Sequence, residues 1–212
     1  MHPIRLAEDL WLKARSLTTS VRHLFQYQFS ERKNRLRLCA CCRLSERLLS
    51  ESAVRDAIAV AERYADGMID ISELVRYRGQ LERQTFHTLE ARGRFVVASI
   101  LASPEELQHV YVHKLLNGER DRNRLDRIAN HISRDIFGNP FRPVNFDPRW
   151  RTSDTIGLAR AIYDERAFDR LPILADALMD AGCEDEQIIA HCRSEGPHVL
   201  GCWAVDLVLG NS

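Results

Sequence analysis

Cysteine and histidine are the residue types of this chain that could support the most specific chemistry. Six cysteines occur among the 212 residues, three of them at positions 39–42 and three between 183 and 202. If both regions are helical, Cys39 and Cys42 share one helix face at a spacing of three residues, and His198 and Cys202 share another at a spacing of four. Two such pairs facing each other would supply the nitrogen and sulfur ligands of tetrahedral Zn²⁺.

Zinc is therefore one candidate cofactor, although the spacing differs from that of zinc fingers and zinc ribbons. The alternative is that the chain needs no cofactor and that its thiols act as small hydrophobic side chains in the core. On the zinc hypothesis, the ligands come from a set of six residues near the two ends of the chain. That set is Cys39, Cys42, His191, Cys192, His198 and Cys202.

The end of the chain places three polar residues inside an apolar run. Residues 197–209 are predicted to form a buried helix, on which His198, Cys202 and Asp206 would follow one another at a spacing of four residues. One interpretation makes this stripe a site, either as a metal edge or as a nucleophilic thiol at Cys202 with a histidine base and an orienting carboxylate. The other is structural, with Asp206 paired to an arginine or a backbone amide, because a lone buried carboxylate is costly.

Basic residues are concentrated at the front of a chain that has no net charge. Residues 1–50 carry ten Lys and Arg against four Asp and Glu, whereas residues 151–212 carry five against eleven. A basic patch in the expected helix 32–49 could neutralise phosphates, which makes nucleic acid a candidate partner. The alternatives are a solvated helix face, or a front region that docks on acidic residues of this or another chain. The patch consists of Arg32, Lys33, Arg35, Arg43 and Arg47.

Motifs of several enzyme and membrane classes are missing from the sequence. It contains no GxxxxGK[ST] or GxGxxG phosphate loop, no HExxH metal motif, no GxSxG nucleophile motif and no protein-kinase motif. No run approaches the roughly 18 apolar residues of a membrane span, and the first residues lack the apolar stretch of a signal peptide. We therefore expect no membrane partner, a cytoplasmic location and reduced cysteines.

Apolar residues recur at helical spacing over nearly the whole chain, and no strand-like alternation of useful length occurs. The predicted fold class is all-α, a multi-helix bundle. Asp66-Gly67 is expected to end one helix, because glycine tolerates the left-handed conformation that closes helices. Helices are expected at residues 4–17, 32–49, 52–66, 71–101, 103–117, 119–136, 153–165, 167–181, 184–193 and 197–209.

A Pro/Phe-rich strap interrupts this helical pattern at residues 137–150. It holds three prolines and three phenylalanines, Phe137, Phe141 and Phe146, and cannot be regular helix. We expect the strap to be ordered, with its aromatic rings at least partly buried, and to offer a contact surface to a partner. It would divide a helical front part, 1–136, from a compact tail of HEAT-like helical hairpins, 151–212, within one cooperative domain.

Four segments resemble a family of uncharacterised bacterial proteins abundant in planctomycete genomes. They read CACCR at 39–43, RDIFGNPFRPVNFDPRW at 134–150, AIYDERAFDRLPILADALMDAGC at 161–183 and HCRSEGPHVLGCWAVDLVLG at 191–210. The resemblance is close over 134–210 and local over 35–66. It supports the helical fold and implies no activity.

The first functional hypothesis is a non-enzymatic helical module that binds another protein or serves as an accessory subunit. It follows from the missing catalytic motifs, the uneven charge and the strap. The second is a zinc-stabilised nucleic-acid-binding protein that uses the front arginines. The third is a thiol-dependent enzyme centred on Cys202. No role is assigned to residues 79–130.

Overall fold

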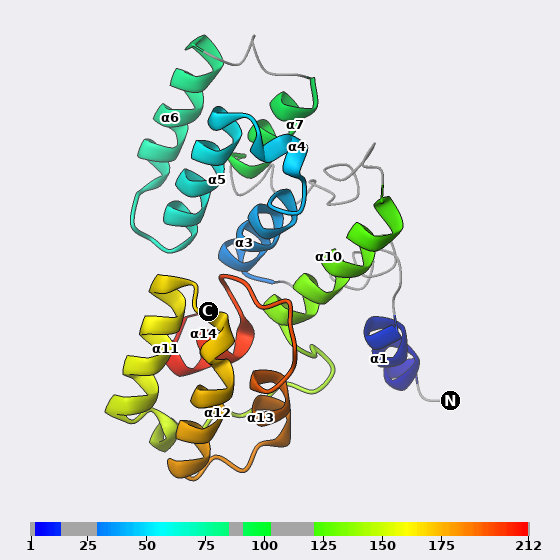
Figure 1. Cartoon of the computed structure of the whole chain (residues 1–212), viewed down its shortest axis with the longest axis vertical. Coiled ribbons are helices and arrows are strands. Elements are labelled where there is room, and N and C mark those ends of the chain that lie inside the picture. Colours follow the sequence, from blue (N-terminus) through cyan, green and yellow to red (C-terminus); the bar gives the residue numbers. More distant parts are fainter. Residues whose placement is uncertain (1–2, 14–28, 85–90, 103–120, 212) are drawn as a thin grey trace. The chain divides into compact units, whose positions relative to one another are not determined.

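The computed structural model describes residues 3–13, 29–84, 91–102 and 121–211. Within these ranges the chain forms α-helices, two short 3-10 helices and no strand (Figure 1), which confirms the predicted all-α class. None of the described helices is long and apolar enough to cross a membrane. The helix expected at 103–117 lies outside the described residues, and the first expected helix is described as α1 (Pro3–Lys13).

The chain divides into two compact units. One consists of residues 10–130, and the other combines residues 1–9 with residues 131–212. The division lies near the expected end of the front part at residue 136, but residues 1–9 group with the strap and the tail. Helices α1 and α10 (Arg122–Phe137) each contribute to both units. The rear cysteines and histidines therefore belong to a single unit.

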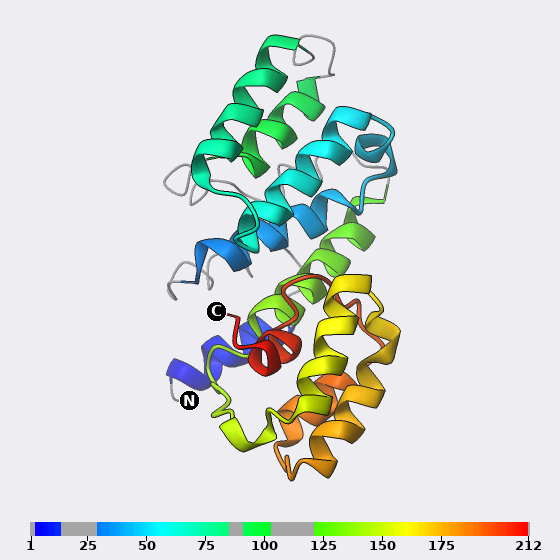
Figure 2. The same ribbon diagram turned by 90° about the vertical axis from the view of Figure 1, so that its left-hand side faces the viewer.

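Helix α5 (Ser52–Ala65) is the centre of the unit of residues 10–130. Its apolar stripe from Val54 to Ala65 is buried, as the helical spacing predicts. The helices packed against it, seen together in Figure 2, are α3 (Glu31–Cys42), α4 (Glu46–Leu49), α6 (Ile71–Gln84) and α7 (Ala91–Ile100).

The single helix expected at 32–49 is in fact two helices. Helix α3 ends at Cys42, and α4 begins after Ser45, whose hydroxyl oxygen accepts the backbone N–H of Leu48 at 3.2 Å. A serine in this position satisfies an amide that a new helix leaves unpaired, which favours a fresh start over continuation. The prediction of one continuous helix was therefore wrong.

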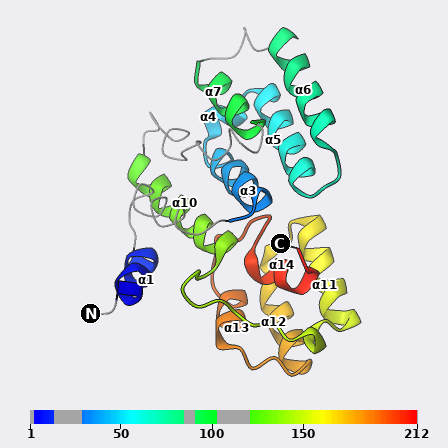
Figure 3. The same ribbon diagram turned by 180° about the vertical axis from the view of Figure 1, so that it is seen from behind.

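The tail is a compact arrangement of four helices, seen from the other side in Figure 3. Helix α12 (Leu171–Asp180) packs against α11 (Ser153–Glu165) and α13 (Glu186–Cys192). Helix α14 (Trp203–Leu209) packs against the same two helices. Asp185 starts α13 by accepting the backbone N–H groups of Gln187 and Ile188. Two 3-10 turns, Pro148–Trp150 and Phe168–Arg170, precede α11 and α12.

The last helix is shorter than the expected 197–209. It begins at Trp203, and residues 193–202 form a loop in which Gly196 and Gly201 have φ angles of 85° and 87°. These left-handed positions suit glycine and interrupt a helix. His198 and Cys202 therefore lie before the helix, and the predicted stripe with Asp206 does not exist. Asp206 itself is buried on α14.

The strap is ordered, as expected. Phe137 is buried, and Phe141 and Phe146 are half-buried. The ring of Phe146 meets the Trp150 ring edge-on, with centroids 5.3 Å apart, and the Arg151 guanidinium lies 5.0 Å from the Phe146 centroid. Contacts of this kind hold a segment whose prolines already restrict its backbone. A role in binding a partner remains a prediction.

Candidate metal centre

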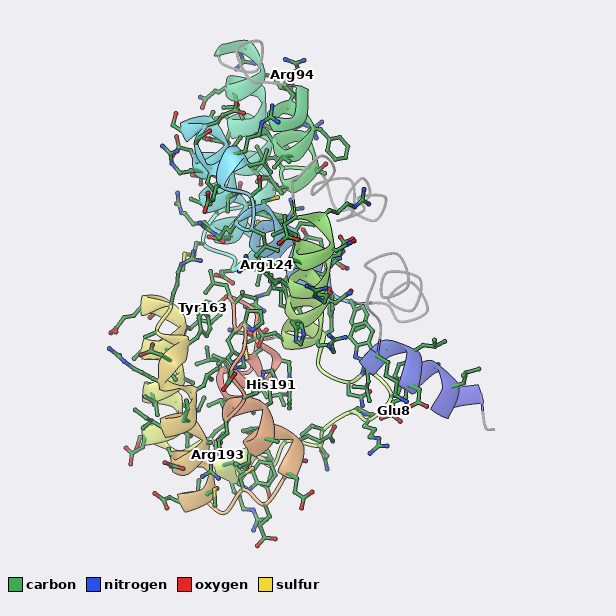
Figure 4. All side chains as sticks on the ribbon, turned by 45° about the vertical axis from the view of Figure 1, so that its right-hand side comes forward. Glu8, Arg94, Arg124, Tyr163, His191 and Arg193 are labelled. Carbon is green, nitrogen blue, oxygen red and sulfur yellow. The ribbon has the colours of Figure 1, made fainter. Side chains whose placement is uncertain are left out.

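Four side chains converge inside the unit that contains the tail. Asp135 comes from the end of α10, His191 from α13, His198 from the 193–202 loop, and Cys202 from the residue that precedes α14. One potential ligand atom of each lies within 4.8 Å of the other three. Figure 4 labels His191, which lies beside the carboxyl end of α10. These residue types are metal ligands in proteins.

Three distances within this group are somewhat shorter than those of a tetrahedral zinc site. Asp135 Oδ1 lies 2.6 Å from His198 Nδ1 and 3.1 Å from His191 Nε2. The same His191 Nε2 lies 3.2 Å from Cys202 Sγ. Zinc bonds of about 2.0–2.3 Å place tetrahedral ligand atoms roughly 3.3–3.8 Å apart, so small side-chain adjustments would fit this group around the ion.

Backbone contacts hold the carboxylate and the loop together. The second oxygen of Asp135, Oδ2, accepts the backbone N–H of Val199 at 2.9 Å. The far nitrogen of His198, Nε2, lies 3.2 Å from the carbonyl oxygen of Ser194. A hydrogen bond from a ligand's second ring nitrogen to a carbonyl is the usual way in which proteins orient a metal-binding histidine.

That hydrogen bond has a direct chemical consequence. If Nε2 of His198 donates its hydrogen to the carbonyl of Ser194, Nδ1 of the neutral ring carries a lone pair. This lone pair faces an Asp135 oxygen only 2.6 Å away. Two acceptors at this distance repel each other unless a proton or a metal ion lies between them.

Two glycines make room for the centre. A Cβ atom on Gly196 would lie 2.9 Å from the backbone nitrogen of His198, and the φ angle of Gly196 is also positive. A Cβ atom on Gly138 would lie 3.2 Å from the Trp203 ring. That ring in turn packs on His191 with centroids 4.9 Å apart. Gly138 thereby lets Trp203 support the His191 imidazole.

Burial and charge set the protonation of the group. Burial of Asp135 favours its neutral form, but hydrogen bonds and charge from His191 and His198 outweigh this and lower its pKa. Burial of His198 opposes protonation, yet the hydrogen bond and charge of Asp135 outweigh it and raise the pKa of His198. Burial, followed by the charge of Asp135, raises the pKa of Cys202 well above its ordinary value. His198 and Cys202 therefore tend to carry protons, which a metal ion would have to displace when it binds.

The structure assembles part of the ligand set expected from the sequence. It brings together His191, His198 and Cys202, but Cys192 and Asp206 are not members of the group. Cys39 and Cys42 belong to the other unit, where both are fully buried on α3. The group found among the described residues does not include Cys39 or Cys42, and the pairing of front and rear cysteines stays a prediction.

Asp135 is the functional residue that the sequence analysis missed. It follows Ile128 and Ile132 at spacings of seven and three residues, so it occupies a position of the apolar stripe of α10. It is only 3% exposed. An acidic residue at an expected core position was the signal that could have identified it.

The proposed basic patch is only partly open: Arg43 and Arg47 are exposed, and most of its arginines pair with acids of the same unit. Arg35 is fully buried and donates to the carbonyl oxygens of Ile100 and Ala102 at 2.5 and 2.8 Å, and to Glu31 at 2.6 Å. Arg43 donates to both carboxylate oxygens of Glu62, and Arg32 donates to Asp66. Arg47 is exposed and Lys33 is half-buried. Glu31 lies on α3, and Glu62 and Asp66 lie on α5 and at its end, so these three acids neutralise three of the arginines that were expected to meet phosphates.

The four converging groups could bind a transition-metal ion through two nitrogens, one sulfur and one oxygen. These four groups lie in a unit whose helices α13 and α14 have seven residues each. Comparisons with protein-family models, with curated proteins and with solved structures find no match to this chain. Its chemistry is therefore inferred from its own residues.

Proposed function

We propose that this protein is a zinc-binding helical protein that acts as a non-enzymatic interaction module or accessory subunit. Asp135, His191, His198 and Cys202 would hold Zn²⁺ and so tie α10, α13, the 193–202 loop and α14 together. The observation that carries the proposal is that a single nitrogen, His191 Nε2, faces both Cys202 Sγ and Asp135 Oδ1, at 3.2 and 3.1 Å.

This geometry separates a metal site from a thiol-dependent enzyme. In a Cys–His–Asp catalytic arrangement, the imidazole uses one nitrogen for the thiol and the other for the carboxylate. Here both partners meet the same nitrogen, so their donor atoms surround one point. Cys202 is also fully buried, and its raised pKa keeps the thiol protonated and poorly nucleophilic.

The donor set favours zinc over other common metals. A thiolate ligand is unsuited to Mg²⁺ and Ca²⁺, which prefer oxygen, whereas Zn²⁺ accepts sulfur, nitrogen and oxygen together. Four protein ligands complete a tetrahedron, which is typical of structural sites. Isolated helices as short as α13 and α14 are not stable in water, so a metal that joins them would contribute directly to folding.

An interaction role is supported by the surface of the same unit. Helix α12 exposes Ile173 and Met179, with 57% and 48% of each residue accessible. Helix α12 packs on α13, which would carry a metal ligand, and apolar side chains presented on such a helix are available for contact with another protein. Nucleic-acid binding loses part of its support, because Arg35 is buried and because Arg32 and Arg43 are paired with Asp66 and Glu62.

Native mass spectrometry of the full chain tests this function. The wild-type protein, supplied with zinc and then dialysed against a weak chelator, should retain one Zn²⁺ per chain. Cys202→Ala should lose it. Cys192→Ala is the matched control, since Cys192 is equally buried but lies outside the group, and it should keep the ion. A wild-type protein without bound zinc, or equal loss in both variants, would overturn the proposal.

A further inference from the structure

A small pocket opens on the metal centre. Its volume is about 90 Å³, and its lining includes Asp135, His191 and His198. The fourth ligand, Cys202, is fully buried and is not part of the lining. An ion held by these four residues would have sulfur behind it and the pocket in front. The remaining walls are His131, Arg134, Ser194, Gly196 and Pro197.

We propose that this pocket binds one small oxyanion next to the metal, with Arg134 and His131 as the groups that recognise it. The inference rests on the proposed zinc site and adds a ligand to it. Arg134 and His131 stand three residues apart on α10, so they share one face of the helix. Asp135, one of the metal ligands, stands four residues from His131 on the same face.

The volume limits the class of ligand. A cavity of about 10–15 Å³ holds one water molecule, so a pocket of about 90 Å³ has room for several water-sized groups. Pockets for drug-sized ligands and organic cofactors measure about 300–1,000 Å³. A whole nucleotide or organic cofactor therefore does not fit inside the pocket. A phosphate, a sulfate or a simple carboxylate does.

The charges select an anion. Zn²⁺ bound to one carboxylate and one thiolate forms a neutral centre, and the Arg134 guanidinium adds a positive charge at the pocket wall. His131 and Arg134 both line the pocket, and partial burial, followed by the charge of Arg134, lowers the pKa of His131. Without the metal, Asp135 and His198 pair with each other, and the anion has no metal ion to coordinate. Binding should therefore require zinc.

Arginine also has the right shape for this task. Its planar guanidinium can donate two hydrogen bonds to two oxygens of one phosphate or carboxylate. A bound zinc ion can expand from four to five ligands, which would let the same anion reach the metal. Arg134 would then be the specificity-determining residue of the pocket.

Isothermal titration calorimetry with inorganic phosphate tests the inference on zinc-loaded and metal-free full-length protein. Zinc-loaded protein should bind one phosphate per chain, and metal-free protein should bind none. Arg134→Gln should weaken binding about tenfold or more, since a hydrogen bond to a charged group contributes roughly 1.5–3 kcal/mol. Arg134→Lys should restore part of the affinity. Arg160→Gln is the matched control, because Arg160 is exposed on α11, and it should bind like the wild type.

The outcomes separate this inference from the proposed function. Bound zinc with no heat of phosphate or acetate binding would overturn the oxyanion pocket and leave the zinc site intact. A protein that binds no zinc would overturn both. Equal phosphate binding by Arg134→Gln, with zinc content and circular dichroism unchanged, would refute the role of Arg134. Equal binding without zinc would refute the coupling. A parallel titration with acetate distinguishes a phosphate site from a carboxylate site.

Discussion

Asp135 connects three parts of the centre: His191, His198 and the backbone of the loop before α14. One of its oxygens meets the two imidazoles, and the other accepts the backbone N–H of Val199. The carboxylate thus fixes both histidine rings and the loop between α13 and α14. A buried carboxylate is tolerated only when such partners satisfy it, which explains how an acidic residue can occupy a core position of α10.

The protons held by these residues predict how zinc affinity changes with pH. The raised pKa of Cys202 means that its thiol is protonated at neutral pH and must lose a proton when zinc binds. Each released proton makes affinity rise about tenfold per pH unit, so affinity should increase from pH 7 to pH 8.5. Below the raised pKa of His198, a second proton is released and the dependence should steepen. Competition with a chromophoric chelator measures this, and an affinity independent of pH would contradict it.

At the scale of elements, Arg35 joins two helices of the unit of residues 10–130. It lies on α3, stacks over the Tyr64 ring at 4.8 Å, and binds the carbonyl oxygens of Ile100 and Ala102 at the end of α7. Helix ends leave such carbonyls without partners, and a buried guanidinium can satisfy several of them.

Arg35→Leu should therefore destabilise the protein strongly. The substitution leaves two buried carbonyls and Glu31 without their partner, and removal of one member of a buried charged network costs about 3–5 kcal/mol. Arg47→Leu is the control, since Arg47 is exposed on α4, and it should change stability by less than about 0.5 kcal/mol. Urea unfolding followed by circular dichroism gives both values. Equal effects of the two substitutions would contradict this account of Arg35.

The loop before α14 leads to a second prediction at this scale. Gly196→Ala should destabilise the protein by about 1–3 kcal/mol and weaken zinc binding, because the new Cβ would press on the His198 backbone at a positive φ angle. Gly157→Ala is the opposite case: Gly157 lies within α11 and a Cβ there meets nothing within 4 Å. It should stabilise the protein by roughly 0.5–1 kcal/mol. Thermal melts of both variants test the pair, and the same sign of change in both would be contrary to expectation.

The sequence was informative about helices because their signals are local. Residues 52–66 and 153–165 carry apolar spacing and end signals that nearby residues alone determine, and α5 and α11 match those ranges closely. The metal centre depends instead on contacts such as that between Asp135 and His198, which are 63 residues apart. Apolar spacing says nothing about such a contact. The prediction that Arg35 belongs to a surface patch failed for a related reason. Its charge suggests exposure, but residues 65 and 67 positions away bury it and accept its hydrogen bonds.

At the scale of the whole molecule, the two units should respond differently to metal removal. All four ligands lie in the unit of residues 1–9 and 131–212, so a chelator should loosen that unit and leave the other unchanged. Hydrogen–deuterium exchange should show faster amide exchange in residues 131–211 and no change in residues 29–84. Equal changes in both ranges, or none in residues 131–211, would contradict a local structural role for the metal.

Zinc-edge X-ray absorption spectroscopy of the zinc-loaded protein directly tests which four residues bind the metal. We expect a single sulfur neighbour of zinc at about 2.3 Å, from Cys202. We also expect three nitrogen or oxygen neighbours at about 2.0–2.2 Å, from His191, His198 and Asp135. Two or more sulfur neighbours would indicate that other cysteines bind the metal. A shell without sulfur would exclude Cys202, and either result would contradict the centre described here.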